Sequence, residues 1–126
     1  MVGIVIVSHS ENIARGVVEL CRQMAPEVAM EAAGGLPGGE IGTDFERIYA
    51  AVEAVKSEDG VAILFDMGSA LMTTEMVMEQ FDDIPVKLVN APIVEGAVVA
   101  SVTAVGGATL DEVLEEAHSV YEMEKL

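Results

Sequence analysis

Four short runs of apolar residues, each followed by a stretch of helical period, constrain the fold of this 126-residue chain most strongly. The runs lie at residues 2–7, 28–32, 60–65 and 86–90. The run at residues 2–7 is continuously apolar and rich in β-branched residues, which is typical of a strand buried on both faces of a sheet, whereas the run at 28–32 is a weaker strand signal. The pattern predicts one α/β domain over residues 1–126, with a parallel four-stranded core sheet and helices on both faces.

The first helix is expected over residues 11–24, directly after the first strand. Ser10 is suited to cap its N-terminus, and Pro26 ends it. Apolar residues recur on one face at helical spacing, so we expect that face to be buried. These residues are Ile13, Val17, Leu20, Cys21 and Met24.

Two capping boxes predict two further helix starts. Thr43 with Glu46 should open a helix that runs to about residue 58, and Thr109 with Glu112 should open the last helix. The remaining expected helices are a Met-rich one over 70–81 and one over 91–105, whose valines would equally suit a strand.

Acidic residues outnumber basic ones by 22 to 6, which gives a formal charge of −16. A surface of this charge repels phosphate backbones and anionic lipid, so nucleic-acid and membrane partners are not expected. The charge serves either solubility or adaptation to a salt-rich cytosol, and the sequence leaves both interpretations open.

Targeting signals are not apparent in the sequence. No apolar run approaches the roughly 18 to 20 residues that cross a bilayer. The apolar N-terminal run has no basic segment before it and no small-residue cleavage site after it. Cys21 is the single cysteine, so an intramolecular disulfide cannot form. We therefore expect a cytoplasmic protein.

In a parallel sheet, ligands and chemistry gather beyond the carboxyl ends of the strands, near the point where the strand order reverses. This rule selects four short segments, at residues 8–10, 33–43, 66–69 and 90–92. None of them contains Lys or Arg.

The glycine-rich segment 33–43 invites comparison with a nucleotide-binding loop. Its glycines have the spacing of a Walker loop, but Glu40 and Ile41 stand where Lys and Ser or Thr are needed. A carboxylate at that place repels a triphosphate. The segment is therefore either a flexible turn or a mobile wall beside His9.

A metal site and a hydrolase triad are both poorly supported. The only histidines, His9 and His118, lie on different elements, and one cysteine cannot complete a tetrahedral site. Ser8 or Ser69 with His9 and Asp66 could form a triad, but the G-x-S-x-G elbow is absent. We expect no bound metal.

His9 is the remaining candidate, as a nucleophile that takes and releases a phosphoryl group. Asp66, at the end of the third strand, is the natural acceptor for one ring nitrogen, which leaves the other free. Backbone N–H groups near Glu11 and in the Gly68–Ser69 turn can receive the phosphoryl oxygens. A structural histidine at a strand end is the alternative.

Four stretches of this chain resemble a known family in order and spacing. They are GIVIVSHS, AAGGLPGGEIGTD, ILFDMGSALMTTEM and VNAPIVEGAVVAS, and the resemblance covers residues 3 to about 119. The family is the phosphocarrier subunit of phosphoenolpyruvate-dependent dihydroxyacetone kinase, within the mannose-type EIIA branch of the phosphotransferase system.

The resemblance implies a mannose-type EIIA fold with His9 as the phosphorylated residue and Asp66 as its hydrogen-bonding partner. It implies enzyme I and HPr as donors, and as acceptor ADP held by the nucleotide-binding kinase subunit, so no cofactor is expected on this chain. It also implies a homodimer that covers residues 93–105 or a sheet edge. The other residues expected to line the site or bind the phosphoryl group are Ser8, Ser10, Gly34, Gly35, Thr43, Gly68 and Ser69.

Two alternatives remain open at this point. One is a mannose-type EIIA domain that serves sugar transport and passes its phosphoryl group to a membrane permease. The other is a module without catalytic activity that binds a small anion or a partner at the same strand ends.

Overall fold

The computed structural model describes residues 1–126 and contains four strands and five α-helices. In chain order these are β1 (Gly3–Ser8), α1 (Glu11–Met24), β2 (Met30–Gly34), α2 (Phe45–Val55), β3 (Val61–Phe65), α3 (Leu71–Met78), β4 (Val86–Leu88), α4 (Ile93–Val105) and α5 (Leu110–His118). Short 3₁₀ turns at Gly68–Ala70 and Ser119–Glu122 precede α3 and follow α5.

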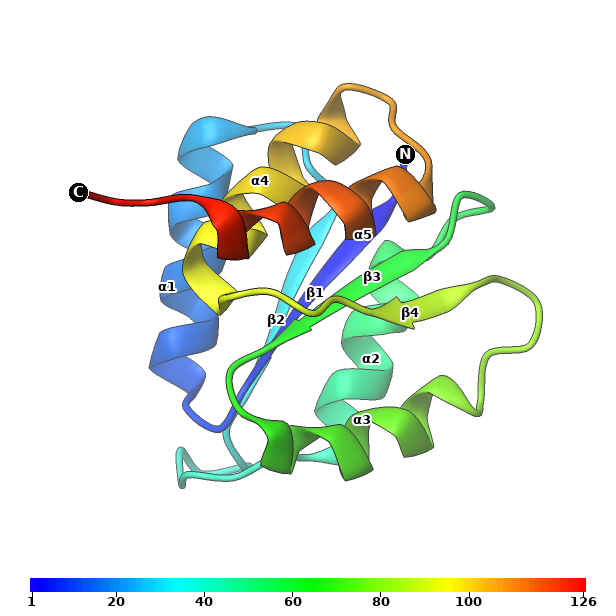
Figure 1. Ribbon diagram of the computed structural model, residues 1–126. Coiled ribbons are helices and arrows are strands. Elements are labelled where there is room, and N and C mark those ends of the chain that lie inside the picture. The colour runs from blue at the N-terminus through cyan, green and yellow to red at the C-terminus, as the bar shows by residue number, and fades with distance from the viewer.

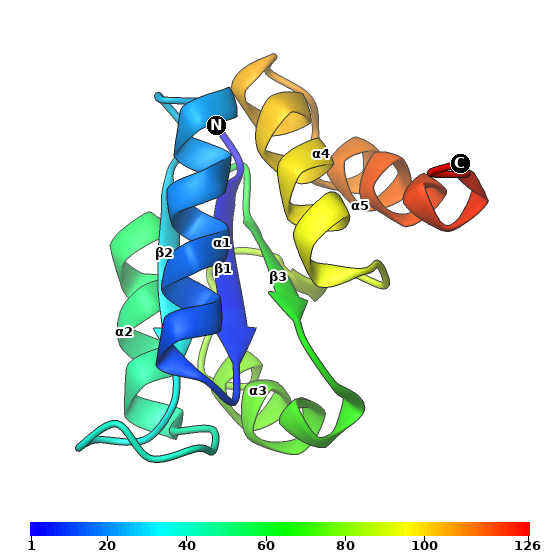
Figure 2. The same ribbon diagram turned by 90° about the vertical axis from the view of Figure 1, so that its left-hand side faces the viewer.

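The four strands form one parallel sheet with the order β2-β1-β3-β4. Helices α1, α4 and α5 cover one face, and α2 and α3 cover the other (Figures 1 and 2). The expected α/β architecture is therefore confirmed. The chain moves from β1 outward to β2 and then returns past β1 to β3, so the strand order reverses between β1 and β3.

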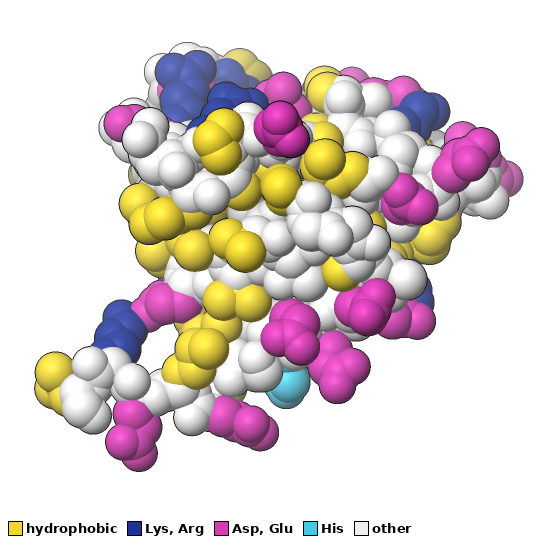
Figure 3. Space-filling view, turned by 90° about the horizontal axis from the view of Figure 1, so that it is seen from above, with side chains coloured by type: hydrophobic (Ala, Val, Ile, Leu, Met, Phe, Trp, Pro, Cys, Tyr) yellow, Lys and Arg dark blue, Asp and Glu magenta, His cyan; other side chains and the backbone are white.

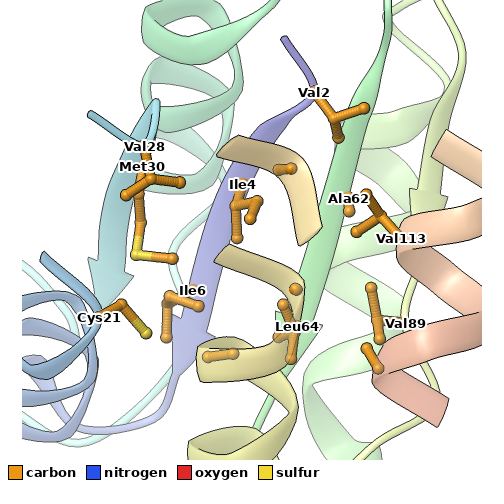
Figure 4. Close-up of a cluster of buried hydrophobic side chains, with 14 of the residues drawn as sticks. Val2, Ile4, Ile6, Cys21, Val28, Met30, Ala62, Leu64, Val89 and Val113 are labelled. Carbon is orange, nitrogen blue, oxygen red and sulfur yellow. The ribbon is translucent and has the colours of Figure 1, made fainter. Parts of the chain in front are cut away.

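The central strand β1 explains why its sequence is a continuous apolar run. All six of its residues are buried, and successive side chains point to opposite faces. Ile4 and Ile6 join the larger core cluster under α1, α4 and α5 (Figure 4), whereas Val5 and Val7 join the cluster under α2 and α3. Because both faces are covered, the strand is apolar up to Val7, and its one polar residue, the buried Ser8 at its end, has its hydroxyl hydrogen-bonded to Asp66.

The buried stripe of α1 differs from the expected one. Val17 and Cys21 are buried as expected, but Ile13, Leu20 and Met24 are 49%, 39% and 58% exposed. Ala14 and Val18 are buried in their place. The helix turns its smaller residues inward, since α1 packs closely against β2 and α4, and its larger apolar residues form an exposed row.

Of the two expected capping boxes, one is correct and one is wrong. Thr109 and Glu112 exchange both hydrogen bonds at the start of α5. At α2, however, the cap is Asp44, whose carboxylate accepts from the Arg47 amide at 3.0 Å. The segment 91–105, for which strand and helix were both compatible, forms helix α4.

Acidic side chains are spread over the end of the molecule seen in Figure 3, which carries the amino ends of the strands. Lys and Arg side chains occupy only a few places on that surface. No helix combines the length and the apolar character needed to span a bilayer.

Candidate active site

His9 and Asp66 meet where the strand order reverses. His9 follows the end of β1, and Asp66 follows the end of β3, which is the strand paired with β1 on that side. The carboxyl ends of these strands point to the lower edge in Figure 1, beside α3 and the segment that joins β2 to α2. The side chains of His9 and Asp66 are only 17% and 12% exposed.

The Asp66 carboxylate accepts four hydrogen bonds. Oδ1 is 2.9 Å from His9 Nδ1 and accepts from the Met67 amide at 2.7 Å. Oδ2 accepts from the Ser8 hydroxyl at 2.8 Å and from the His9 amide at 3.0 Å. Burial alone raises the pKa of Asp66, but these four hydrogen bonds outweigh it and hold the pKa below its ordinary value. Asp66 is therefore an anion at neutral pH.

This anion selects the tautomer of His9. An ionised carboxylate has no proton to donate, so the short contact requires that His9 Nδ1 carries the hydrogen. The neutral ring then has its lone pair on Nε2. Nε2 is 2.9 Å from the Ser69 hydroxyl, which donates to it from the turn before α3. The ring is thus held between Asp66 at Nδ1 and Ser69 at Nε2.

The hydroxyls of Ser8 and Ser10, next to His9 in the chain, both form hydrogen bonds within the protein. Ser8 is completely buried, and its hydroxyl accepts from the Ser10 amide at 3.0 Å while it donates to Asp66. The Ser10 hydroxyl accepts from the Ile13 amide at 3.3 Å and caps α1. Both residues therefore lie beside His9, and their side chains stabilise the local structure by hydrogen bonds to Asp66 and to the start of α1.

The glycine-rich segment packs directly against His9 and the start of α1. The Gly42 amide donates to the His9 carbonyl at 2.9 Å, and the Gly35 amide donates to the Ser8 carbonyl at 3.1 Å. A Cβ on Gly34 would stand 2.5 Å from the Ser10 carbonyl oxygen, so only glycine permits this approach. The Thr43 hydroxyl donates to the Thr73 hydroxyl of α3 at 3.2 Å.

Several backbone N–H groups near the ring donate no hydrogen bond within the chain. They belong to Glu11 and Asn12 in the first turn of α1, and to Gly68 and Ser69 in the turn before α3. The free N–H groups of a helix N-terminus carry the positive end of the helix dipole and favour an anion. The two segments that were expected to receive phosphoryl oxygens therefore have donors available.

Sequence reasoning missed one charged group near the site. Arg47, from the first turn of α2, donates through Nη1 to Glu11 Oε1 and to the Gly34 carbonyl, each at 3.1 Å. None of the four strand-end segments contains a cation, yet Arg47 reaches one of them, at Gly34, from a neighbouring helix. Only the tertiary packing of α2 beside β2 brings it there, and no local pattern indicates it.

Comparison with known proteins gives a family match over most of the chain. A family model described as EIIA-man, PTS system fructose IIA component, matches residues 3–114. The phosphotransferase subunit DhaM of the PTS-dependent dihydroxyacetone kinase from Lactococcus lactis is 42% identical over 114 residues, which are 90% of this chain and 91% of that protein. The phosphoryl donor subunit DhaM of the PEP-dependent dihydroxyacetone kinase from Escherichia coli is 39% identical over 132 residues, which are 99% of this chain but only 28% of that protein.

Solved structures share the fold. The unknown function protein EF1359 superposes with a TM-score of 0.81 at 32% identity and covers 94% of each chain. The phosphotransferase system component EIIA from Streptococcus agalactiae superposes with a TM-score of 0.72 at 14% identity, over 99% of this chain and 97% of that one. The four-stranded sheet with helices on both faces is thus the fold found in this group of proteins.

Proposed function

This chain belongs to the EIIA-man family of the phosphotransferase system, and we propose that it is the phosphoryl donor subunit of a dihydroxyacetone kinase. It takes a phosphoryl group from the phosphotransferase system and passes it to the kinase. The similarity to the Lactococcus subunit, which extends over nine-tenths of both chains, supports this assignment. The Escherichia coli relative is more than three times as long, so what its remaining part does is not carried over.

One observation carries the proposal, namely the His9 ring held between Asp66 and Ser69. With Nδ1 donating to the Asp66 carboxylate, Nε2 is the atom that attacks phosphorus. The donor is a phosphohistidine on HPr, so a P–N bond breaks in the donor as a P–N bond forms at Nε2. The positive charge that develops on the His9 ring is stabilised by the Asp66 anion.

The phosphoryl oxygens are met by hydrogen-bond donors. The free N–H groups of Glu11 and Asn12, together with those of Gly68 and Ser69, are placed on the two segments that flank the ring. The Ser69 hydroxyl, which donates to Nε2 in the unphosphorylated protein, donates to a phosphoryl oxygen once Nε2 is occupied. Transfer onward reverses the step, with a phosphate oxygen of ADP as the attacking atom.

The nucleotide belongs to the partner in this proposal. Glu40 and Ile41 occupy the places where a Walker loop has its Lys and hydroxyl residues, which supports a chain without nucleotide of its own. ADP is held instead by the nucleotide-binding kinase subunit. The donors are HPr and enzyme I, and the strongly acidic surface favours partners with basic contact surfaces.

A homodimer is also part of the proposal. Exposed apolar side chains lie on the adjacent helices α1 and α4, and such a surface favours contact with a second chain. Its members are Ile13, Leu20, Met24, Val94 and Val102.

Phosphorylation with purified enzyme I, HPr and phosphoenolpyruvate tests the carrier function. The wild type should incorporate one phosphoryl group, located on the peptide that contains His9 by mass spectrometry, and His9→Ala should incorporate none. His118→Ala is the matched control, because His118 Nδ1 likewise lies 2.7 Å from an acceptor, the Asn90 carbonyl, but has no Ser69 counterpart. Equal labelling of wild type and His9→Ala would refute the carrier function.

The acceptor is tested by adding the kinase subunits, ADP and dihydroxyacetone to the labelled protein. Loss of label with formation of dihydroxyacetone phosphate supports the kinase assignment. Retention of label there, with transfer to a membrane sugar permease, would instead assign the chain to sugar transport.

A further inference from the structure

A cluster of one carboxylate and two guanidinium groups lies beside the first turn of α1, and none of its hydrogen bonds or ion pairs involves the His9 ring. Glu11 Oε1 is 3.1 Å from Arg47 Nη1 and 3.1 Å from Arg15 Nη2. The same Nη1 of Arg47 donates to the Gly34 carbonyl at 3.1 Å. Arg47 therefore joins the first residue of α1 to the last residue of β2 and to the first turn of α2.

Glu11 also lines a cavity that does not include the His9–Asp66 pair. This cavity, of about 320 Å³, lies along the outer edge of β2 and is lined by Glu11, Arg15 and Arg47 among others. Neither His9 nor Asp66 lines it. The ion pairs with Arg47 and Arg15 thus hold the carboxylate at this cavity, which the His9 ring does not line.

This placement matters because Glu11 is only two residues after His9. A carboxylate in the first turn of a helix is attracted to the free N–H groups of that turn. Those of Glu11 and Asn12 have no partner within the chain. A phosphoryl group requires the same positive helix end, so a Glu11 side chain that turned toward it would compete for these donors and repel the incoming dianion.

We infer that Arg47, assisted by Arg15, is a positioning residue for phosphoryl transfer: it holds the Glu11 carboxylate away from the N-terminus of α1 and neutralises it. The inference rests on the proposed carrier function. Arg47 does not touch the phosphoryl group, and its effect passes through Glu11. Arg15 is 72% exposed and Arg47 only 33%, so Arg47 is the more firmly fixed of the two partners.

The chain offers a matched control for Arg47. Arg22 Nη2 donates to the Met30 carbonyl at 2.8 Å, which lies at the opposite end of the same edge strand. Arg22 forms no ion pair with a carboxylate and lies far along α1 from its first turn. Both arginines therefore bind a carbonyl of β2, and only Arg47 also binds Glu11.

The experiment measures the rate of labelling by phospho-HPr for wild type, Arg47→Met, Arg22→Met, Glu11→Gln and the double variant Glu11→Gln/Arg47→Met. Methionine keeps the length of the arginine stem, and glutamine keeps the size of glutamate. Arg47→Met should slow labelling about 3- to 10-fold at low salt, which is the range of charge effects at helix ends. The deficit should shrink as salt screens the freed carboxylate.

Rescue distinguishes the inferred role from a purely structural one. The double variant should recover the wild-type rate, because the charge that Arg47 controls is gone, and Arg22→Met should label at the wild-type rate. A double variant as slow as Arg47→Met would show that Arg47 has only a structural role, independent of the Glu11 charge, and would overturn the inference. Equal rates for wild type and Arg47→Met would overturn it and leave the carrier function intact, whereas an unlabelled wild type would overturn both.

Discussion

Replacing Asp66 by asparagine tests the central feature of the site, which is the choice of the free nitrogen on His9. The substitution keeps the size of the side chain but turns one acceptor oxygen into an NH₂ group. All four groups that face the carboxylate are donors, from Ser8, His9 and Met67. Whichever way the amide is turned, its NH₂ group faces two of them.

The expected loss of stability follows from these four contacts. Hydrogen bonds to a charged acceptor contribute about 1.5–3 kcal/mol each, against about 0.5–1.5 kcal/mol for neutral pairs. Two weakened and two lost contacts, partly relieved by relaxation and water, give a net loss of about 2–4 kcal/mol. A domain of this size is stable by about 5–15 kcal/mol, so Asp66→Asn should remain folded.

The expected loss of transfer is larger. An asparagine NH₂ group that donates to His9 Nδ1 forces the proton onto Nε2, the atom that should attack phosphorus. Weakening a partner that orients a histidine costs about 10- to 100-fold, and imposing the wrong tautomer costs up to about 10⁴-fold. We therefore expect labelling by phospho-HPr to slow by roughly 10²- to 10⁴-fold.

Rapid-quench labelling gives the rate, circular dichroism gives the melting temperature, and ¹⁵N NMR of the imidazole reports which nitrogen carries the proton. The wild type should show a protonated Nδ1 in the neutral ring, and Asp66→Asn should show a larger share of protonated Nε2. A folded variant with an unchanged tautomer and an unchanged rate would refute the assigned role of Asp66.

Three further outcomes are expected. Because the folded pKa of Asp66 is lowered, its stabilisation is fully present above the ordinary aspartate pKa and is lost as the pH falls through the lower folded value. The difference in melting temperature between wild type and Asp66→Asn should therefore shrink on acidification below about pH 4, and a constant difference would contradict this. Ser69→Ala removes the hydroxyl next to His9 Nε2 and should slow labelling about 3- to 10-fold with little change in melting temperature, since the residue is exposed. Gly34→Ala should lose about 2–3 kcal/mol by denaturant titration, because its Cβ meets a carbonyl oxygen at 2.5 Å, whereas Gly16→Ala, with no atom within 4 Å on an exposed helix face, should gain about 0.5–1 kcal/mol.

The strands and the meeting of His9 with Asp66 could be predicted because their signals are local and redundant. A strand buried on both faces must be largely apolar, so the run at β1 has few other interpretations. Parallel strands then bring their carboxyl ends to one edge, which places His9 and Asp66 together without any knowledge of side-chain contacts.

The errors arise where tertiary contacts decide between equivalent local choices. Thr43 and Thr109 carry the same capping signal, but Thr43 binds Thr73 on α3, and the adjacent Asp44 caps α2 instead. On α1, periodicity indicates an apolar stripe but not its rotation. Close packing on β2 favours the small Ala14 inside and leaves the larger Ile13 exposed.

The distribution of positive charge around His9 suits a group that must leave as readily as it arrives. A guanidinium group bound directly to the phosphoryl oxygens would stabilise the phosphohistidine and slow its onward transfer. In this structure Arg47 binds a carboxylate and a backbone carbonyl instead. In the proposed mechanism the phosphoryl group meets neutral backbone N–H groups, whose hold is weaker than that of an ion pair. The cation near the site thus removes an opposing negative charge without binding the phosphoryl group itself, so the site can favour capture without preventing release.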